Sequence, residues 1–474
     1  MRRALIPICC IALLAAGCGG GGPPVTDSER RVGAEQHPQL LSQFGGAYEE
    51  RQAAYVASLG EKLAANAGLE RQCTFTLVNT DVVNAFAVPG CYIYITRGLL
   101  GIVNSEAELA SVLAHELGHI AANHSERQQR RSIIRSLGVL AVSMLSGSER
   151  LSQIAGAAAG LFTLRYSRSH EYEADDLGLT YLRRAGYDPY AAADMLNALG
   201  RHQAFLSSTR GRDSAKGIPE WALTHPLTEN RVARAGEAAA ATGLADDELP
   251  EREAEYLRAV DGLLYGDDPA QGFVTGRRFA HPIMRIGFEA PSGFTLTNSP
   301  QAILLEGPDG VRGEFAGGRM PAAGLQGYAR ALLANLLRDA PVEVAPARPF
   351  SANGVPALLV PASVRTREGE VPVTLAAYDA GGGAVYHFVL VGPAAGAAQA
   401  LFESFRLLTA AEAAGLRPRR IRVVAPAPGE TVATLARRMA AEQPLDHLLM
   451  LNGRRRGEPL RPGQPLKLVV TAAR

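Results

Sequence analysis

Two histidines and one glutamate near residue 115 have the spacing of a hydrolytic metal site. His115 and His119 are four residues apart, and Glu116 directly follows the first of them. Positions i and i+4 of an α-helix lie on the same face, so both imidazoles can reach one metal ion. A bound zinc lowers the pKa of its water to about 7, and a neighbouring carboxylate can take the proton as that water attacks a carbonyl. The motif therefore predicts peptide-bond hydrolysis with Glu116 as the general base.

The residues around this motif predict the helix that it needs. Ser105 is a candidate N-cap, and Glu108 stands three positions later, as in a capping box. A chance match on a solvated helix face is the alternative, but a buried helix with two inward histidines and no metal would leave polar groups unpaired. We therefore expect one zinc ion per chain. The apolar stripe that this helix would bury comprises Leu109, Val112, Leu113, Leu117 and Ile120.

A third metal ligand must come from elsewhere, because a catalytic zinc site usually has three protein ligands and one open position for water. Glu171 and Asp175 lie four residues apart in a second polar cluster within a helical pattern. One of them could bind the metal while the other holds a ligand histidine in its correct tautomer. The residues alone leave open which carboxylate has which role.

Four short motifs follow one another along the chain. They are Asn84-Ala85-Phe86-Ala87-x-Pro89-Gly90, His115-Glu116-x-x-His119, Glu171-x-x-x-Asp175 and Thr224-His225-Pro226-x-x-x-x-Arg231. Their order resembles the zinc metallopeptidase family that includes HtpX and the CAAX prenyl proteases, and within it the soluble periplasmic branch of the YfgC/BepA type. The resemblance covers residues 35–235 and implies a mainly α-helical, zincin-type peptidase domain with a small β-sheet, which we place at residues 31–265.

The resemblance also implies roles for individual residues. His115, His119 and Glu171 would be the zinc ligands, Glu116 the general base, and Asp175 a neighbour of the ligand histidines. The strand from Asn84 to Val88 would be an edge with which substrate backbone can pair. Its substrate-binding residues would be Asn84, Ala85, Phe86 and Ala87.

His225 and Arg231 each have more than one interpretation. His225 can be part of a turn in which Pro226 starts a helix; in the family-like interpretation it lies at the mouth of the site. There it would stabilise the oxyanion, or occupy the fourth zinc position and keep the enzyme shut. Arg231 can neutralise the carboxylates of the second cluster or lie on a solvated helix face. We expect His124 to be the polar end of the motif helix and His170 a solvated neighbour.

Cys73 and Cys91 flank two strand-like segments, residues 74–78 and 92–96. A disulfide between them would close a hairpin-sized loop, which requires an oxidising compartment. The alternative is a pair of small, buried apolar residues.

The N-terminus has the pattern of a bacterial secretory signal with a lipobox. Two arginines precede the apolar residues 4–16, which are too few to span a bilayer, and Cys18 follows. We expect a signal peptide at residues 1–18, lipidation of Cys18, and a flexible tether at residues 19–30. A plain signal peptide is the alternative, because Leu14 lies four residues before the cysteine instead of three. The expected location is the bacterial cell envelope, anchored by lipid to the outer membrane and facing the periplasm.

The rest of the 474 residues predicts two further domains. Acidic and basic residues nearly balance, at a net charge of +1, which argues against a nucleic-acid partner. Residues 131–164 read as a helical hairpin packed on the peptidase core, with lipid contact as the alternative. A helix over residues 250–265 leads to an α+β domain at residues 273–415. It contains alternating strands, among them residues 373–378, and two helical segments, residues 325–337 and 394–408. It lacks clustered His, Cys or paired acids, so we interpret it as a docking appendage.

Residues 419–474 resemble a LysM module. The matching features are Pro428-Gly429-Glu430-Thr431, Asn452-Gly453 and Leu460-x-Pro462-Gly463. They predict a βααβ order, and the resemblance implies binding of N-acetylglucosamine glycans and therefore peptidoglycan.

These features together predict a lipid-anchored zinc endopeptidase. Its expected substrates are unfolded, misassembled or stalled envelope proteins, because the family that the chain resembles works in protein quality control. Two other classes stay open: a metal-bound, chaperone-like scaffold that seldom cleaves, with His225 sealing the zinc, and a wall-binding anchor whose peptidase is secondary.

Overall fold

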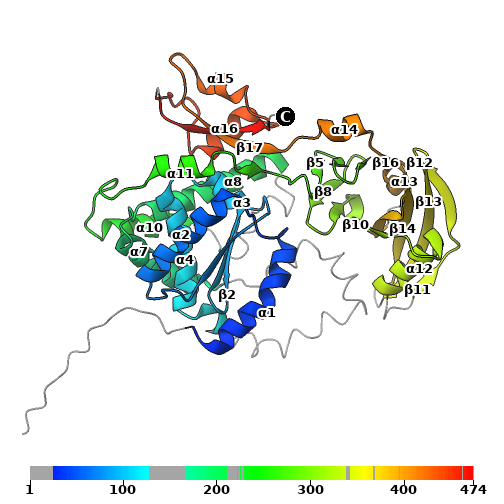
Figure 1. Cartoon of the computed structure of the whole chain (residues 1–474), viewed down its shortest axis with the longest axis horizontal. Coiled ribbons are helices and arrows are strands. Elements are labelled where there is room, and N and C mark those ends of the chain that lie inside the picture. The colour runs from blue at the N-terminus through cyan, green and yellow to red at the C-terminus, as the bar shows by residue number, and fades with distance from the viewer. Residues whose placement is uncertain are drawn as a thin grey trace, which may run out of the picture.

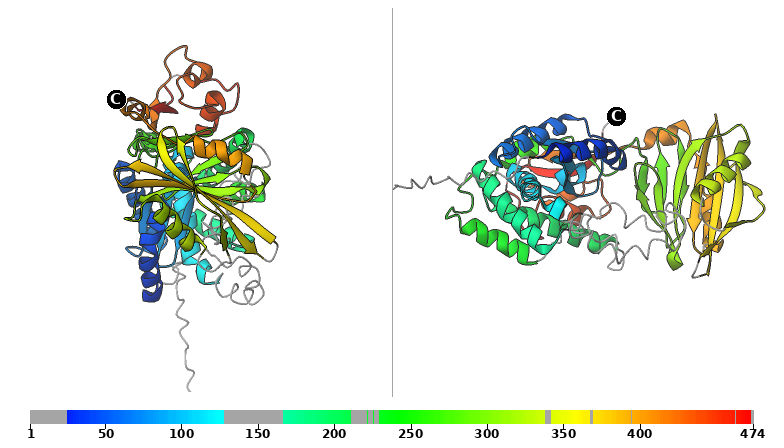
Figure 2. Two further views of the ribbon diagram at one scale, coloured as in Figure 1. Left: turned by 90° about the vertical axis from the view of Figure 1, so that its right-hand side faces the viewer. Right: turned by 90° about the horizontal axis from the view of Figure 1, so that it is seen from below.

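The computed structural model describes residues 25–127, 166–210, 221, 225, 229–337, 342–366, 369–393, 395–461 and 463–472. It shows a helical region with a small sheet, a β-rich region beside it, and a small C-terminal part that lies on the helical region (Figures 1 and 2). The predicted signal peptide, Cys18 and the predicted hairpin at residues 131–164 lie outside the described residues. Among the described helices, none combines the length and the apolar composition that crossing a lipid bilayer requires.

The helical region surrounds helix α4 and a three-stranded sheet of order β1-β3-β2, in which β1 is parallel and β2 antiparallel to β3. This confirms the prediction of a mainly helical domain with a small sheet. Helix α1 begins at Asp27, where Thr26 and Glu29 form a capping box. The predicted tether at residues 19–30 is therefore wrong for its last four residues, which are helical. The elements are α1 (Asp27–Gln43), α2 (Arg51–Asn66), β1 (Thr74–Val78), β2 (Ala85–Val88), β3 (Tyr92–Thr96), α3 (Arg97–Ile102), α4 (Glu106–Ala121), α7 (Arg168–Arg184), α8 (Ala191–Arg210), α10 (Glu229–Ala240) and α11 (Glu253–Val260).

Helix α4 begins where the sequence predicts, but only one of the two hydrogen bonds of the expected capping box is present. Ser105 Oγ accepts a hydrogen bond from the Glu108 N–H at 3.0 Å. The Glu108 carboxylate accepts from the N–H of Asn104 at 2.9 Å, one residue before the N-cap. Nearly every residue of α4 is buried in the main core, between α7, α8, α2 and the sheet. A helix packed on all sides holds its side chains in fixed positions, as a metal site requires.

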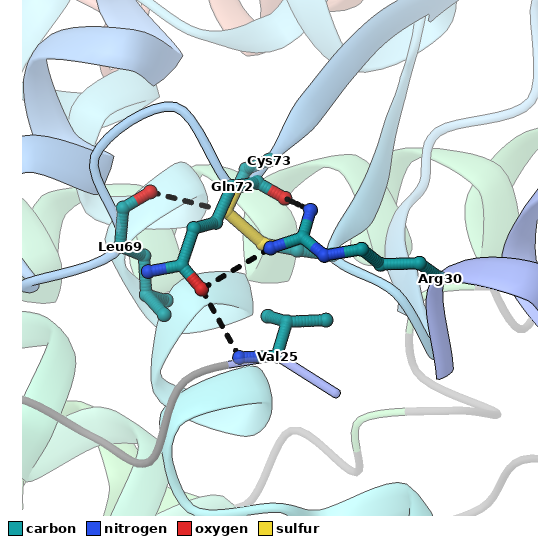
Figure 3. The surroundings of a disulfide bond; sticks show 6 residues. Val25, Arg30, Leu69, Gln72 and Cys73 are labelled. Carbon is teal, nitrogen blue, oxygen red and sulfur yellow. Dashed lines mark hydrogen bonds between the residues drawn. A yellow bond between two sulfur atoms is a disulfide. The ribbon is translucent and has the colours of Figure 1, made fainter. Parts of the chain in front are cut away.

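A disulfide joins Cys73 to Cys91 beside the start of α1 (Figure 3). The Cα atoms are 4.5 Å apart, and the bond closes a loop of 18 residues that contains β1 and β2. Constraining a loop of this length in the unfolded chain stabilises the fold by about 3 kcal/mol. Next to it, Gln72 Oε1 accepts from the Val25 N–H at 3.1 Å and from Arg30 Nη2 at 3.3 Å, which attaches α1 to this loop.

The β-rich region contains an eight-stranded sheet of order β11-β13-β14-β15-β10-β9-β8, with β12 on β13, and a four-stranded sheet of order β16-β7-β6-β5. Side chains alternate along the central strands: Leu375 and Val389 face helix α12 (Gly324–Leu336), whereas Ala376 and Phe388 face α13 (Ala395–Glu403). The predicted helix at residues 394–408 is too long, because α13 ends at Glu403 and β16 pairs with β7.

The strands of this region are β5 (Phe273–Thr275), β6 (Arg278–His281), β7 (Ile286–Glu289), β8 (Thr295–Asn298), β9 (Ile303–Glu306), β10 (Arg312–Arg319), β11 (Val342–Val344), β12 (Arg348–Ala352), β13 (Val355–Thr366), β14 (Gly369–Gly381), β15 (Ala384–Val391) and β16 (Arg406–Leu407). Its helices are α12 (Gly324–Leu336), α13 (Ala395–Glu403) and α14 (Ala410–Gly415).

The C-terminal part has the order β17 (Arg419–Val424), α15 (Val432–Ala436), α16 (Pro444–Leu451) and β18 (Leu466–Thr471). Strands β17 and β18 are antiparallel, and β4 (Leu264–Tyr265) from the preceding region adds a third strand. The predicted helix over residues 250–265 is therefore wrong at both ends, because α11 spans only Glu253–Val260 and residues 264–265 are in this sheet.

Buried contacts join the C-terminal part to the helical region. Ile421 of β17 belongs to the main core. Lys467 of β18 is fully buried, and its Nζ donates to the carbonyl of Gly101 at 2.9 Å and to that of Val103. Both carbonyls lie at the end of α3, just before α4. The two parts are therefore packed as one body.

Deletion of residues 419–474 is accordingly expected to destabilise the peptidase region. It removes the two hydrogen bonds of Lys467, about 0.5–1.5 kcal/mol each, and exposes to water the core residues on which Ile421 packs, about 1.5–3 kcal/mol per large side chain. Thermal unfolding should show the midpoint of the truncated protein lowered by roughly 10 °C or more. An unchanged midpoint would show that the C-terminal part is an independent appendage, which is what the sequence alone predicts.

The contact between Tyr265 and His447 predicts a dependence of stability on pH. Tyr265 Oη and His447 Nε2 share a hydrogen bond of 2.6 Å, and burial, assisted by Arg419, lowers the pKa of His447 to about 4. Because the pKa is lower in the folded than in the unfolded chain, stability is full above pH 6.5 and falls between pH 6.5 and 4, by about 3 kcal/mol. Unfolding midpoints at pH 7.5 and 5 should differ less in His447→Gln than in the wild type. An equal difference in both proteins would assign the acid sensitivity to other groups.

Candidate metal centre

Helices α4 and α7 bring the two sequence motifs together, and two glycines allow their close approach. A Cβ at Gly118 would lie 2.8 Å from the Ala174 carbonyl oxygen, and one at Gly178 would lie 3.0 Å from the backbone nitrogen of His115. Side chains at these positions would force the helices apart. Gly118, within the His115–His119 motif, therefore allows α7 to pack directly against the metal-binding turn of α4.

Four buried side chains direct their donor atoms at one point: His115, His119, Glu171 and His225. His115 Nε2 lies 3.0 Å from His119 Nε2 and 3.3 Å from His225 Nδ1, and His225 Nδ1 lies 3.1 Å from Glu171 Oε1. All four donor atoms lie within 4.8 Å of one another. Three imidazole nitrogens and one carboxylate oxygen are ligands that zinc takes in a tetrahedral site, so these residues fit the metal.

The charges around this point favour a cation. Burial disfavours the imidazolium of His225, but the carboxylates of Glu171 and Glu116 outweigh it and raise the pKa of His225. Burial also tends to raise the pKa of Glu171, but His225, His115 and Arg231 hold it below its ordinary value. Glu171 therefore stays ionised, as a metal-binding carboxylate must be.

Glu116 lies beside the four donors and is fully buried. Neither of its carboxylate oxygens has a hydrogen-bond partner within the part of the chain that the structure describes, and Oε1 is 3.6 Å from His225 Nε2. Burial raises its pKa, against the lowering effects of His225 and His115. A buried carboxylate without a partner is costly, and a raised pKa makes it a better proton acceptor. Both properties suit a general base.

Asp175 and Arg231 bind the ligand side chains on the side away from the donor cluster. Asp175 Oδ1 lies 2.9 Å from His115 Nδ1, so it can hold the proton of His115 on Nδ1 and leave Nε2 free for the metal. Arg231 donates to both Asp175 oxygens, at 2.9 and 2.7 Å, and lies 2.8 Å from Glu171 Oε2. The Arg231 side chain is 2% exposed, which excludes the interpretation that it lies on a solvated helix face. The alternative left open by the residues is thereby decided: Glu171 is in the donor cluster and Asp175 is behind it.

Strand β2 borders the site at the edge of its sheet. The Ala87 N–H of β2 is close enough to the Glu116 carboxylate to lower the pKa of Glu116, but the contact does not meet hydrogen-bond geometry. The Asn84 side chain is buried, and its Oδ1 accepts from the Ala85 N–H at 2.9 Å. The side chains of residues 84–88, including Phe86, are all buried. Only the backbone of this edge strand could then pair with substrate, and such pairing stays a prediction.

Four aromatic side chains that the sequence did not assign to the site pack around it. Tyr166 stacks on His119 with ring centroids 4.0 Å apart, and Trp221 stacks on His225 at 5.3 Å. His124 and His170 are both fully buried and stack on each other at 4.4 Å. The predictions of a polar helix end and a solvated neighbour are therefore wrong. Asn123, directly after the C-cap Ala122 of α4, has a φ of 54° and turns the chain so that His124 points back at His119.

Residues 50–239 match Peptidase family M48. The beta-barrel assembly-enhancing protease of Yersinia pestis is 33% identical over 231 residues, 46% of this chain and 45% of the relative. The protein of the same name from Escherichia coli K12 is 34% identical over 191 residues, 38% and 37% of the two chains. The mitochondrial metalloendopeptidase OMA1 of Arabidopsis thaliana is 35% identical over 156 residues, 33% and 29% of the two chains. The chain thus spans less than half the length of these relatives.

The matched segment contains the whole donor cluster. The class defined by this site is therefore a zinc metallopeptidase. Within that class, the zinc site formed by His115, His119, Glu171 and His225 lies in the segment that is similar to Peptidase family M48.

Proposed function

We propose that this chain is a zinc-dependent endopeptidase of the bacterial cell envelope that hydrolyses misfolded or stalled envelope proteins. The observation that carries the proposal is the carboxylate of Glu116, which lies beside four converging donors and has no hydrogen-bond partner among the described residues. When bound, zinc would polarise the scissile carbonyl and activate a water. Glu116 would accept the proton of the attacking water, and Asp175 would keep His115 in the tautomer that binds metal.

The envelope location has independent support. A disulfide between Cys73 and Cys91 is compatible with an oxidising compartment. The relatives named beta-barrel assembly-enhancing protease suggest envelope proteins as substrates. Attachment to the outer membrane through a lipidated Cys18 remains part of the proposal.

The test compares the purified full-length protein with its Glu116→Gln variant on one outer-membrane β-barrel protein, presented unfolded and then folded in detergent. We expect fragments from the unfolded form with the wild type alone. Cleavage by both proteins would reveal a contaminating protease, and equal cleavage of the folded form would contradict the substrate class.

His225 is expected to restrain the enzyme. Four protein donors fill a tetrahedral zinc, whereas catalysis needs one position for water or substrate. His225→Ala should therefore retain zinc on His115, His119 and Glu171 and increase proteolysis, including self-cleavage, as seen in fragment yield over time. If His225 instead stabilises the oxyanion, the same change costs about 10²–10³ in rate. Unchanged activity would contradict both roles and leave the turn-forming interpretation.

The same four-donor arrangement favours a second function, a metal-bound, chaperone-like scaffold that seldom cleaves. Such a protein would suppress aggregation of unfolded envelope proteins equally well as wild type and as Glu116→Gln. The βααβ order of residues 419–471 also supports a peptidoglycan-binding role for the C-terminal part, as the LysM resemblance implies. Sedimentation of the full-length protein with isolated peptidoglycan tests that role.

A further inference from the structure

The two ligand histidines of α4 are supported in different ways. His115 Nδ1 faces a carboxylate, that of Asp175, which Arg231 in turn binds at two points. His119 Nδ1 faces another imidazole: its partner is His124 Nδ1, at 2.8 Å. On the far side of that ring, His124 Nε2 lies 3.2 Å from Glu173 Oε2, to which Arg127 Nη1 donates at 2.8 Å.

The proton positions along this series of hydrogen bonds, from His119 through His124 to Glu173, follow from one requirement. His119 Nε2 lies among the converging donors, so it must be unprotonated to bind metal, and the proton of His119 is on Nδ1. That N–H can donate only if His124 Nδ1 is unprotonated. The proton of neutral His124 is then on Nε2, where it donates to Glu173. Each group thus fixes the tautomer of the next.

Packing holds the participants in place. His124 is fully buried and stacks on His170 at an interplanar angle of 15°, while His119 stacks on Tyr166 at 19°. The Glu173 carboxylate, in contrast, lies at the surface, with a side chain 43% exposed. The buried metal ligand is therefore linked through one imidazole to a solvent-accessible carboxylate.

We propose that His124 and Glu173 are positioning residues that hold His119 in the tautomer and orientation required for zinc binding. The inference rests on the zinc site of the proposed function. Removal of an outer hydrogen-bond partner typically costs 10–100-fold in metal affinity. We expect a loss of that size when the acceptor at His124 is removed and a smaller one when Glu173 is removed, because an exposed charge is screened by water.

The experiment measures the zinc affinity of full-length proteins by competition with a chromophoric chelator. His124→Asn places an amide oxygen near the former Nδ1 and can accept from His119, whereas His124→Leu cannot. We expect affinity close to wild type for the Asn variant and about 10–100-fold weaker for the Leu variant. Asp176→Ala is the matched control for Glu173, because Asp176 lies on the same helix, is exposed and pairs with an arginine, Arg234, but with no histidine. It should leave the affinity unchanged.

Thermal unfolding of the zinc-free proteins separates positioning from general stability. A merely structural role would lower stability in both His124 variants without a difference in zinc affinity between Asn and Leu, and that result would overturn the proposal. If His124→Leu does not fold, the comparison of Glu173→Gln with Glu173→Ala decides, since only Gln keeps an oxygen for His124 Nε2–H. Failure of the wild type to bind zinc would instead refute the metal assignment itself.

Discussion

Glu116→Gln is expected to abolish peptide hydrolysis and to leave zinc in place. The amide fills the same volume beside the donor cluster but cannot accept a proton from water. Loss of a general base typically lowers the rate by 10²–10⁴-fold, and we expect at least that loss here, because Glu116 is the one carboxylate beside the donors that has no hydrogen-bond partner among the described residues. The measurements are initial rates on an unfolded protein substrate and zinc content per chain.

Asp176→Asn provides the matched control for this change. Asp176 follows Asp175 on α7, but its side chain is exposed and pairs with Arg234. The control should keep both zinc and activity. Hydrolysis by Glu116→Gln within tenfold of the wild type would assign the proton transfer to another group.

Glu171→Ala is expected to lower zinc content from one ion per chain to none. It removes the one carboxylate of the donor cluster, and Glu173 cannot replace it because that side chain faces His124 and Arg127. The change also takes one of two acidic partners from Arg231, which is buried. Breaking a buried ion pair typically costs about 3–5 kcal/mol, in addition to the stability that zinc itself provides.

Metal analysis and thermal unfolding with and without a chelator check this prediction. The wild type should lose stability when zinc is removed, whereas Glu171→Ala should be insensitive to the chelator. His115→Ala should lose zinc as well, with a smaller loss of metal-free stability, because Arg231 then keeps both carboxylates. Full zinc content in Glu171→Ala would contradict the ligand assignment.

The sequence predicted the site residues that lie on regular helices. The i, i+4 spacing placed His115 with His119, and Glu171 with Asp175, because a helix fixes which side chains share a face. It did not decide between the two carboxylates, since that depends on how α7 crosses α4. Nor did it find the buried place of His124, which depends on the left-handed turn at Asn123, two residues beyond the end of α4.

Local patterns failed where distant segments decide the structure. Leu264 and Tyr265 continue a helical pattern, yet they pair with Arg419 and Arg420 of β17. The predicted strand at residues 373–378 is only the apolar centre of β14, which continues to residues 369 and 381 because β13 and β15 supply hydrogen bonds there. Pairing between strands far apart in sequence outweighs the local preference of such residues.

The buried position of Lys467 has a consequence for the geometry of proteolysis at a surface. When a binding module is joined to an enzyme by a flexible linker, the active site can reach any point within the length of that linker and in any orientation. Here the β18 strand that carries Lys467 is fixed to the chain segment directly before the zinc-binding helix. If residues 419–471 bind a polymer, the zinc site would therefore have a fixed orientation relative to that polymer. Cleavage would then be limited to proteins that approach from one side of it.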